Sequence, residues 1–181
     1  MIATAGLAVE AHTPAAVGGM PEVDEDQDSF SGNALKKARA LAAILPEDGW
    51  ALADDSGLCV DALGGAPGVY SARYAGDDAT DSDNIDKLLE ALDGIEERNR
   101  SASFRCHLAI VAPHGEELVF EGSCLGEIIH ERRGEGGFGY DPVFVPVGHE
   151  STFAELSDNE KASLSHRGDA MRQFVAWLKG R

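Results

Sequence analysis

The chain has 181 residues, of which 43% are hydrophobic, and 32 acidic against 15 basic residues give it a formal net charge of −17. This length and apolar content suit a globular core of one compact domain or two closely joined lobes. The negative charge repels nucleic-acid backbones and argues against DNA or RNA as a partner. No run of 18 apolar residues occurs, so no membrane span is predicted.

The cysteines and the N-terminal residues bear on the compartment. Cys59, Cys106 and Cys124 are odd in number, far apart and set in apolar runs, a pattern that predicts three buried free thiols in a reducing cytosol. The first nine residues lack a basic segment, which argues against a secretory signal. We therefore expect a soluble cytoplasmic protein.

The first third of the chain predicts a short strand at residues 7–11 and an acidic loop at residues 14–28. Ser29 or Ser31 can cap a helix that runs to Leu45 and stops before a proline. The short apolar run at residues 50–53 then predicts a strand.

The rest of the chain alternates strand and helix patterns. A helix is expected at 81–92, a long strand at 101–112, one or two hairpin strands within 117–131, and a strand at 142–147. Ser157 with Glu160 forms a capping box for a short helix, and Ser165 can cap a final one. This alternation predicts an α/β layered fold, with a central mixed sheet flanked by helices.

Two adjacent carboxylates follow the strand at 50–53. Asp54 and Asp55 precede Ser56-Gly57, which predicts that the strand ends in an acidic pair and a tight turn at the rim of a sheet. Oxygen ligands of this kind suit Mg²⁺, with Mn²⁺ possible. The alternative is an acidic surface turn without a ligand.

A glycine-rich segment at 134–139 matches G-x-G-x-x-G, but a strand-like run with prolines follows it instead of the helix that a dinucleotide fingerprint requires. Phe138 or Tyr140 can stack on a flat base, and the exposed backbone amides can read its edge. A purely structural glycine turn is the alternative.

Cations are scarce, yet they gather at two places. Three lie within residues 36–39, and Lys161, His166 and Arg167 lie within seven residues of one another. Lysine offers a point charge to phosphate, and arginine offers a bidentate fork. The alternative for the second group is helix capping with solvent-exposed side chains.

The order of several motifs resembles the inosine triphosphate pyrophosphatase family. The match covers residues from about Leu7 to the C-terminus. It runs through S-F-x-x-N-A-x-x-K-A at 29–38, A-D-D-S-G-L at 53–58, G-G-A-P-G-x-Y-S-A-R-Y at 64–74, G-F-G-Y-D-P at 137–142, A-E-L at 154–156, E-K at 160–161 and S-H-R at 165–167.

The resemblance implies a house-cleaning hydrolase of nucleotide metabolism, in which an active-site cleft lies between two lobes. Its reaction would be Mg²⁺-dependent hydrolysis of ITP, dITP or XTP to the nucleoside monophosphate and pyrophosphate. It also implies a homodimer. Asp55 would be the metal ligand and proton acceptor, supported by Asp54, with Asp24 or Glu25 as a further metal ligand. The substrate-binding residues would be Lys37, Ser56, Phe138, Gly139, Tyr140, Asp141, Lys161, His166 and Arg167.

The N-terminus departs from the family pattern. Family members open with a strand and Thr/Ser-x-Asn-x-x-Lys, whereas no asparagine precedes Asn33 and no lysine precedes Lys36. We therefore expect a single domain over residues 1–181 that is short at its N-terminus. Two alternatives follow: a pyrophosphatase for other modified nucleotides, or a nucleotide-binding subunit with little activity.

Overall fold

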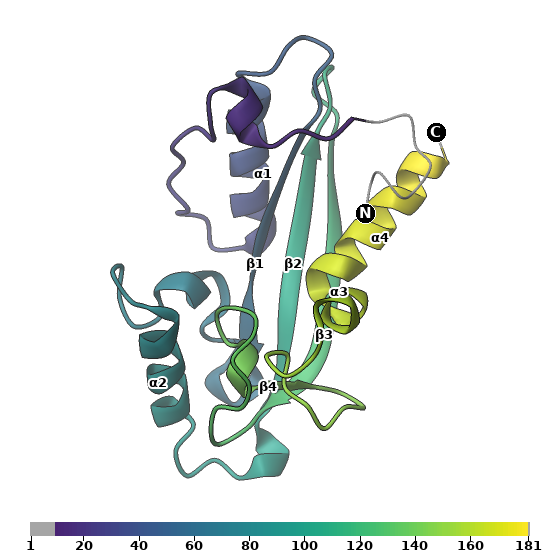
Figure 1. Ribbon diagram of the computed structural model, residues 1–181. Coiled ribbons are helices and arrows are strands. Elements are labelled where there is room, and N and C mark those ends of the chain that lie inside the picture. The colour runs from purple at the N-terminus through teal and green to yellow at the C-terminus, as the bar shows by residue number, and fades with distance from the viewer. Residues whose placement is uncertain (1–9, 181) are drawn as a thin grey trace. The chain divides into compact units, whose positions relative to one another are not determined.

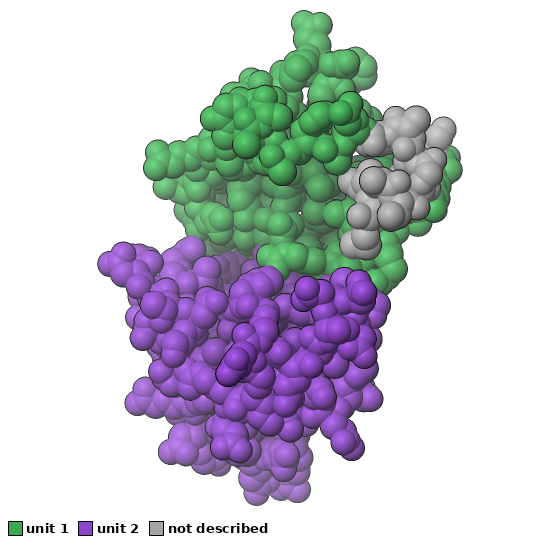
Figure 2. All heavy atoms as spheres, viewed as in Figure 1, with its two compact units in different colours: residues 1–55, 106–122, 167–181 green, residues 56–105, 123–166 purple. Residues whose placement is uncertain are grey.

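The computed structural model describes residues 10–180, which form two compact units (Figure 2). Unit 1 comprises residues 10–55, Cys106–Gly122 and 167–180, and unit 2 comprises Ser56–Arg105 and Ser123–His166. Most of the strand expected at 7–11 lies outside the described residues, and residues 10 and 11 have no regular structure.

The α-helices and strands of the described residues confirm an α/β fold (Figure 1). In chain order they are α1 (Phe30–Ala42), β1 (Ala51–Val60), α2 (Asp81–Ala91), β2 (Ser101–Val111), β3 (Glu117–Ile128), β4 (Phe144–Pro146), α3 (Asp158–Leu164) and α4 (His166–Lys179). None of these helices combines the length and apolar character that crossing a membrane requires.

The four strands form one sheet in the order β1-β2-β3-β4. The expected mixed sheet is wrong for the described residues, because these strands pair antiparallel. A helix between two strands is usual where the strands are parallel. However, α2 packs beside the end of β1 and the chain returns in the opposite direction, so Leu58 and Val60 share a core with Ala102 and Phe104.

Strand β1 is longer than expected and does not end at the acidic pair. It continues through Asp54, Asp55 and the following Ser-Gly to Val60. The continuation is stabilised by burial, because Leu58 and Val60 are fully buried in the core of unit 2. The expected tight turn at residues 56–57 is therefore wrong, and both carboxylates lie within an extended strand.

Unit 1 has three layers, with α1 and α4 on opposite faces of the strands (Figure 1). Side chains alternate along β2 because successive strand residues point to opposite faces. Ala109 and Val111 pack in the cluster of α1, whereas Leu108 and Ile110 pack in the cluster of α4.

Helix starts follow the predicted capping. Ser29 accepts a hydrogen bond from the Gly32 amide at 3.1 Å and begins α1, which settles the choice between Ser29 and Ser31. Ser157 and Glu160 form the expected capping box of α3. The last helix starts at His166, directly after Ser165.

The core of unit 2 contains a cluster of aromatic rings around Phe104. Phe104 lies with its ring centroid 4.7 Å from that of Phe144, 5.8 Å from that of Phe153 and 4.9 Å from that of His166. All three cysteines of the chain are buried free thiols, as expected. Burial raises the pKa of the Cys124 thiol to about 11, so this thiol stays protonated and unreactive at neutral pH.

Truncation of the central ring should destabilise the protein strongly. We expect Phe104→Ala to lower the free energy of unfolding by about 3–5 kcal/mol, because it leaves a cavity among three rings. The matched control is Phe138→Ala, whose ring is 61% exposed and whose loss should cost less than about 1 kcal/mol. Equal losses in the two variants, measured by urea unfolding, would contradict this packing.

Candidate active site

The two adjacent aspartates of β1 point to opposite faces of the sheet. Ala51 and Ala53 pack with the α1 cluster and Leu52 with the α4 cluster, so the alternation places Asp55 on the α1 face and Asp54 on the α4 face. The two adjacent carboxylates therefore lie in different environments within unit 1.

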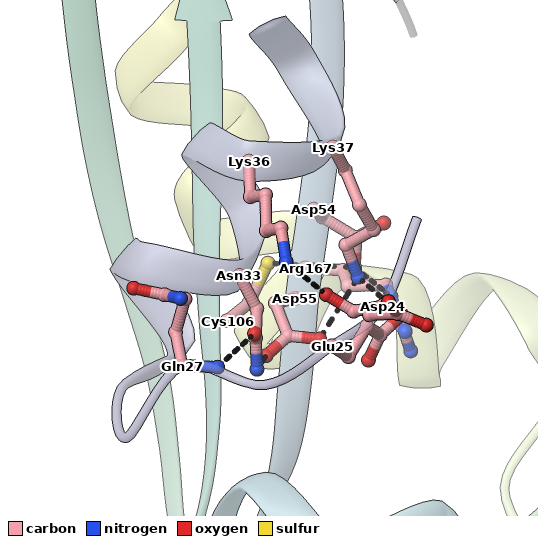
Figure 3. A network of polar contacts seen from close by, with 10 residues as sticks. All are labelled: Asp24, Glu25, Gln27, Asn33, Lys36, Lys37, Asp54, Asp55, Cys106 and Arg167. Atoms are coloured by element: carbon pink, nitrogen blue, oxygen red, sulfur yellow. Dashed lines mark hydrogen bonds and ion pairs between the residues drawn. The ribbon is translucent and has the colours of Figure 1, made fainter. Parts of the chain in front are cut away.

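On the α1 face of the sheet, a lysine from α1 contacts two carboxylates (Figure 3). Lys37 Nζ lies 2.9 Å from Asp55 Oδ1 and 3.1 Å from Glu25 Oε1. The Asp55 side chain is 9% exposed, that of Lys37 17% and that of Glu25 36%. The structure thus brings together three residues that the sequence analysis assigned to the metal and substrate site.

Burial and charge act on this group in opposing ways. Burial raises the pKa of the Asp55 carboxyl, and the hydrogen bonds from Lys37 and Asn33 work against that rise. Burial alone would lower the pKa of Lys37, but the hydrogen bonds and attraction of Asp55 and Glu25 hold it above its usual value. Lys37 therefore remains an ammonium and neutralises one of the two negative charges.

A buried asparagine, to which the sequence analysis gave no role, connects Asp55 to the acidic loop. Asn33 is fully buried, and its Nδ2 donates to Asp55 Oδ2 at 3.2 Å. Its Oδ1 accepts from the Gln27 backbone amide at 3.0 Å. Its role could have been predicted in part. A polar residue among the buried positions of a helix needs hydrogen-bond partners.

The other loop acid, Asp24, is engaged through its main chain. Lys36 Nζ donates to the Asp24 carbonyl and to Asp26 Oδ1, both at 2.8 Å. Of the two loop acids that the sequence left open as metal ligands, Glu25 shares the Lys37 ammonium with Asp55 through its carboxylate.

Asp54 pairs with the last helix instead. Arg167 Nε donates to Asp54 Oδ2 at 2.9 Å, and the thiol of Cys106 lies 4.0 Å from the same oxygen. Both members of the ion pair are partly exposed, at 45% for Arg167 and 36% for Asp54. The expected support of Asp55 by Asp54 is not a direct contact, because the two carboxylates face different layers.

In unit 2 a buried carboxylate organises the glycine-rich loop. Asp141 Oδ2 accepts a hydrogen bond from the Phe138 amide at 2.8 Å and forms an ion pair with Lys161 Nζ. A side chain at position 137 would collide with that carboxylate, so Gly137 is required there, and its φ of 74° also favours glycine. Asp141 is therefore buried within the loop that it holds.

The two aromatic residues of the loop differ in accessibility. The Phe138 ring is 61% exposed, and Lys161 Nζ lies 4.6 Å from its centroid in a cation–π contact. Tyr140 is 3% exposed, and its hydroxyl donates to the Ser71 carbonyl at 2.9 Å. Of the two rings that the sequence left open for stacking, Phe138 is thus the accessible one.

The remaining residues of the predicted site also lie in unit 2. The Gly139 amide donates to Asp81 Oδ2, at the start of α2, at 2.6 Å. His166 is 6% exposed and stacks on Phe104 at an interplanar angle of 11°. Ser56 is half-buried in the part of β1 that belongs to this unit.

The carboxylates of Asp55 and Glu25 are the groups of this site whose chemistry suits a divalent cation. Residues 10–180 contain no group of three or more His, Cys, Asp or Glu side chains that could hold a metal ion. Mg²⁺, however, is usually held by one or two protein carboxylates together with water and substrate phosphates. Asp55 and Glu25 fit this pattern, since Lys37 offsets only one of their two charges.

Known proteins resemble this chain over nearly its full length. The Ham1 family profile matches residues 2–177. The dITP/XTP pyrophosphatase of Opitutus terrae is 50% identical over 94% of this chain and 84% of its own length, and that of Bacillus subtilis is 47% identical over 91% and 82%.

Solved structures agree with this relationship. A HAM1 protein from Coxiella burnetii superposes with a TM-score of 0.90 at 40% identity, covering 99% of this chain and 93% of that one. A dITP/XTP pyrophosphatase from Mycobacterium abscessus gives 0.80 at 42% identity, covering 98% and 90%. These matches confirm the resemblance drawn from the motifs, and the chain belongs to the Ham1 family.

Proposed function

We propose that this protein hydrolyses deaminated purine nucleoside triphosphates (ITP, dITP and XTP) to the nucleoside monophosphate and pyrophosphate. It would thereby clear these nucleotides from the cellular pool. The observation that carries this proposal is the Lys37 ammonium shared between Asp55 and Glu25, in a chain 50% identical to a dITP/XTP pyrophosphatase. The exposed Phe138 ring beside Lys161 supports a nucleotide as the ligand.

Asp55 and Glu25 are the proposed ligands of Mg²⁺ or Mn²⁺. When bound, the metal would lower the pKa of water and offset charge on the phosphoryl oxygens. Asp55 would accept the proton of the attacking water, and burial favours this role because it raises the pKa of the carboxyl. Lys37 would turn from the carboxylates to a phosphate, and Ser56 would contact the substrate.

Base recognition is proposed for the glycine-rich loop and for cations from the C-terminal part of the chain. The Phe138 ring would stack on the purine, and the Phe138–Gly139 segment is held for this by Asp141 and Asp81. Lys161, His166 or Arg167 would donate to the six-position oxygen of hypoxanthine or xanthine. Tyr140 would act as a buried support for the loop.

The proposal includes the oligomeric state and the cellular location. A homodimer is supported by the exposed residues Leu125 (64%) and Val147 (73%), whose backbones are joined by a 2.9 Å hydrogen bond. A cytoplasmic location is supported by three buried free thiols.

A substrate panel tests the reaction. With Mg²⁺, we expect dITP and XTP to yield monophosphate and pyrophosphate. The kcat/KM for dATP should be roughly tenfold to a hundredfold lower, since a donor facing the adenine amino group costs about 1–3 kcal/mol. Chelation by EDTA should stop the reaction. Release of orthophosphate, or a preference for pyrimidine triphosphates, would contradict the proposal.

The two aspartates of β1 provide a matched pair for testing the proton acceptor. Asp55→Asn should lower kcat by about 10²–10⁴-fold while the circular dichroism spectrum stays unchanged. Asp54→Asn, on the other face of the strand, should lower kcat by no more than about tenfold. Near-normal turnover in Asp55→Asn would refute its assigned role.

The ion pair of unit 2 can be tested through both binding and stability. Lys161→Met leaves the 4%-exposed Asp141 carboxylate without its cation, so we expect a loss of about 3–5 kcal/mol in unfolding free energy and a higher KM for dITP. The double variant Asp141→Asn/Lys161→Met should recover part of the stability but not the KM. A single variant as stable as wild type would show that the pair does not hold the loop.

A further inference from the structure

We propose that Asn33 and Lys36 are positioning residues, which seat the acidic loop on α1 so that Glu25 lies on the same side of the sheet as Asp55. This inference rests on the proposed function for its catalytic consequence, but its structural part can be tested without turnover. Neither side chain is assigned to metal or substrate.

The loop contacts α1 at both ends of its segment 24–27. The Gln27 amide donates to Asn33 Oδ1 at 3.0 Å, and Lys36 Nζ donates to the Asp24 carbonyl at 2.8 Å. At Gln27 the loop also passes close to Gly32, where a Cβ atom would lie 2.8 Å from Gln27 Cβ. Glu25 lies between Asp24 and Gln27, and both of these residues bond to α1. The loop backbone therefore limits the positions that the Glu25 carboxylate can reach.

Positions 33, 36 and 37 share one face of α1, because residues three and four apart are neighbours on a helix. Asn33 holds both the loop and Asp55 Oδ2, whereas Lys37 holds Glu25 and Asp55 Oδ1. The two carboxylates repel each other, and Glu25 is the more exposed of the two. The backbone contacts of the loop with α1 therefore add to the Lys37 contact in keeping Glu25 beside Asp55.

The same arrangement recurs in unit 2 without any predicted metal ligand. Asn84 of α2 is 2% exposed, accepts from the Ala75 amide at 2.7 Å and donates to the Ala72 carbonyl at 3.1 Å. Three residues on, Lys87 Nζ donates to the Tyr74 carbonyl at 2.5 Å. Each helix thus uses an asparagine and a lysine at i and i+3 to hold a neighbouring segment, and α2 supplies matched control positions.

The test compares Asn33→Ser and Lys36→Met with Asn84→Ser and Lys87→Met in the full chain. Amide hydrogen exchange is followed over residues 22–28 and 72–75, and Mn²⁺ binding is measured by electron paramagnetic resonance without nucleotide. We expect the α1 variants to speed exchange in 22–28 at least tenfold, to weaken Mn²⁺ binding about tenfold and to lower kcat more than they raise KM. The α2 variants should speed exchange only in 72–75 and keep the wild-type Mn²⁺ affinity.

The proposal is overturned if exchange in 22–28 is unchanged in the α1 variants, or if their Mn²⁺ affinity stays within twofold of that of the α2 variants. Failure of the proposed function would look different. In that case the wild-type chain would release no pyrophosphate from dITP, while the exchange measurements would still decide whether α1 seats the loop.

Discussion

The ammonium group of Lys37 holds together the part of this molecule to which we assign catalysis. It lies within hydrogen-bonding distance of carboxylates from a strand and a loop, both far from it in sequence. Burial makes the charge on Asp55 unfavourable, and the lysine compensates for that cost without cancelling the charge of both acids. A divalent cation carries a larger positive charge and repels an ammonium. In the proposed function, Asp55 and Glu25 would hold that cation, and Lys37 would be available to the substrate phosphates.

Unit 2 uses a second buried ion pair for a different purpose. Asp141 accepts from the backbone of the glycine-rich loop and pairs with Lys161, and the lysine in turn lies against the Phe138 ring. One carboxylate thereby sets the loop conformation and the place of a cation at the same time. In both units, an acid buried beside a lysine orders the groups to which we assign ligand binding: carboxylate oxygens in unit 1 and an aromatic face in unit 2.

The sequence predicted the helices well, since α1, α2 and α3 begin at or next to residues expected to start them. The sequence-based prediction failed where tertiary contacts determine how far an element extends. Strand β1 runs past Asp55 because Leu58 and Val60 are buried, and nothing local to the Asp-Asp-Ser-Gly run signals this. That extension sends Asp54 to the Arg167 side, which a turn would not have done. Motif order predicted site roles for Lys37, Asp55 and Lys161. It gave no role to Asn33 and Asp81, because their partners Asp55 and Gly139 come from distant parts of the sequence.

The most direct measurement is anomalous diffraction from crystals of the wild-type protein grown with Mn²⁺. We expect a manganese peak at the carboxylate oxygens of Asp55 and Glu25, with the Lys37 ammonium displaced from both. A peak at other residues, with Lys37 still bridging the two carboxylates, would contradict the proposed metal site.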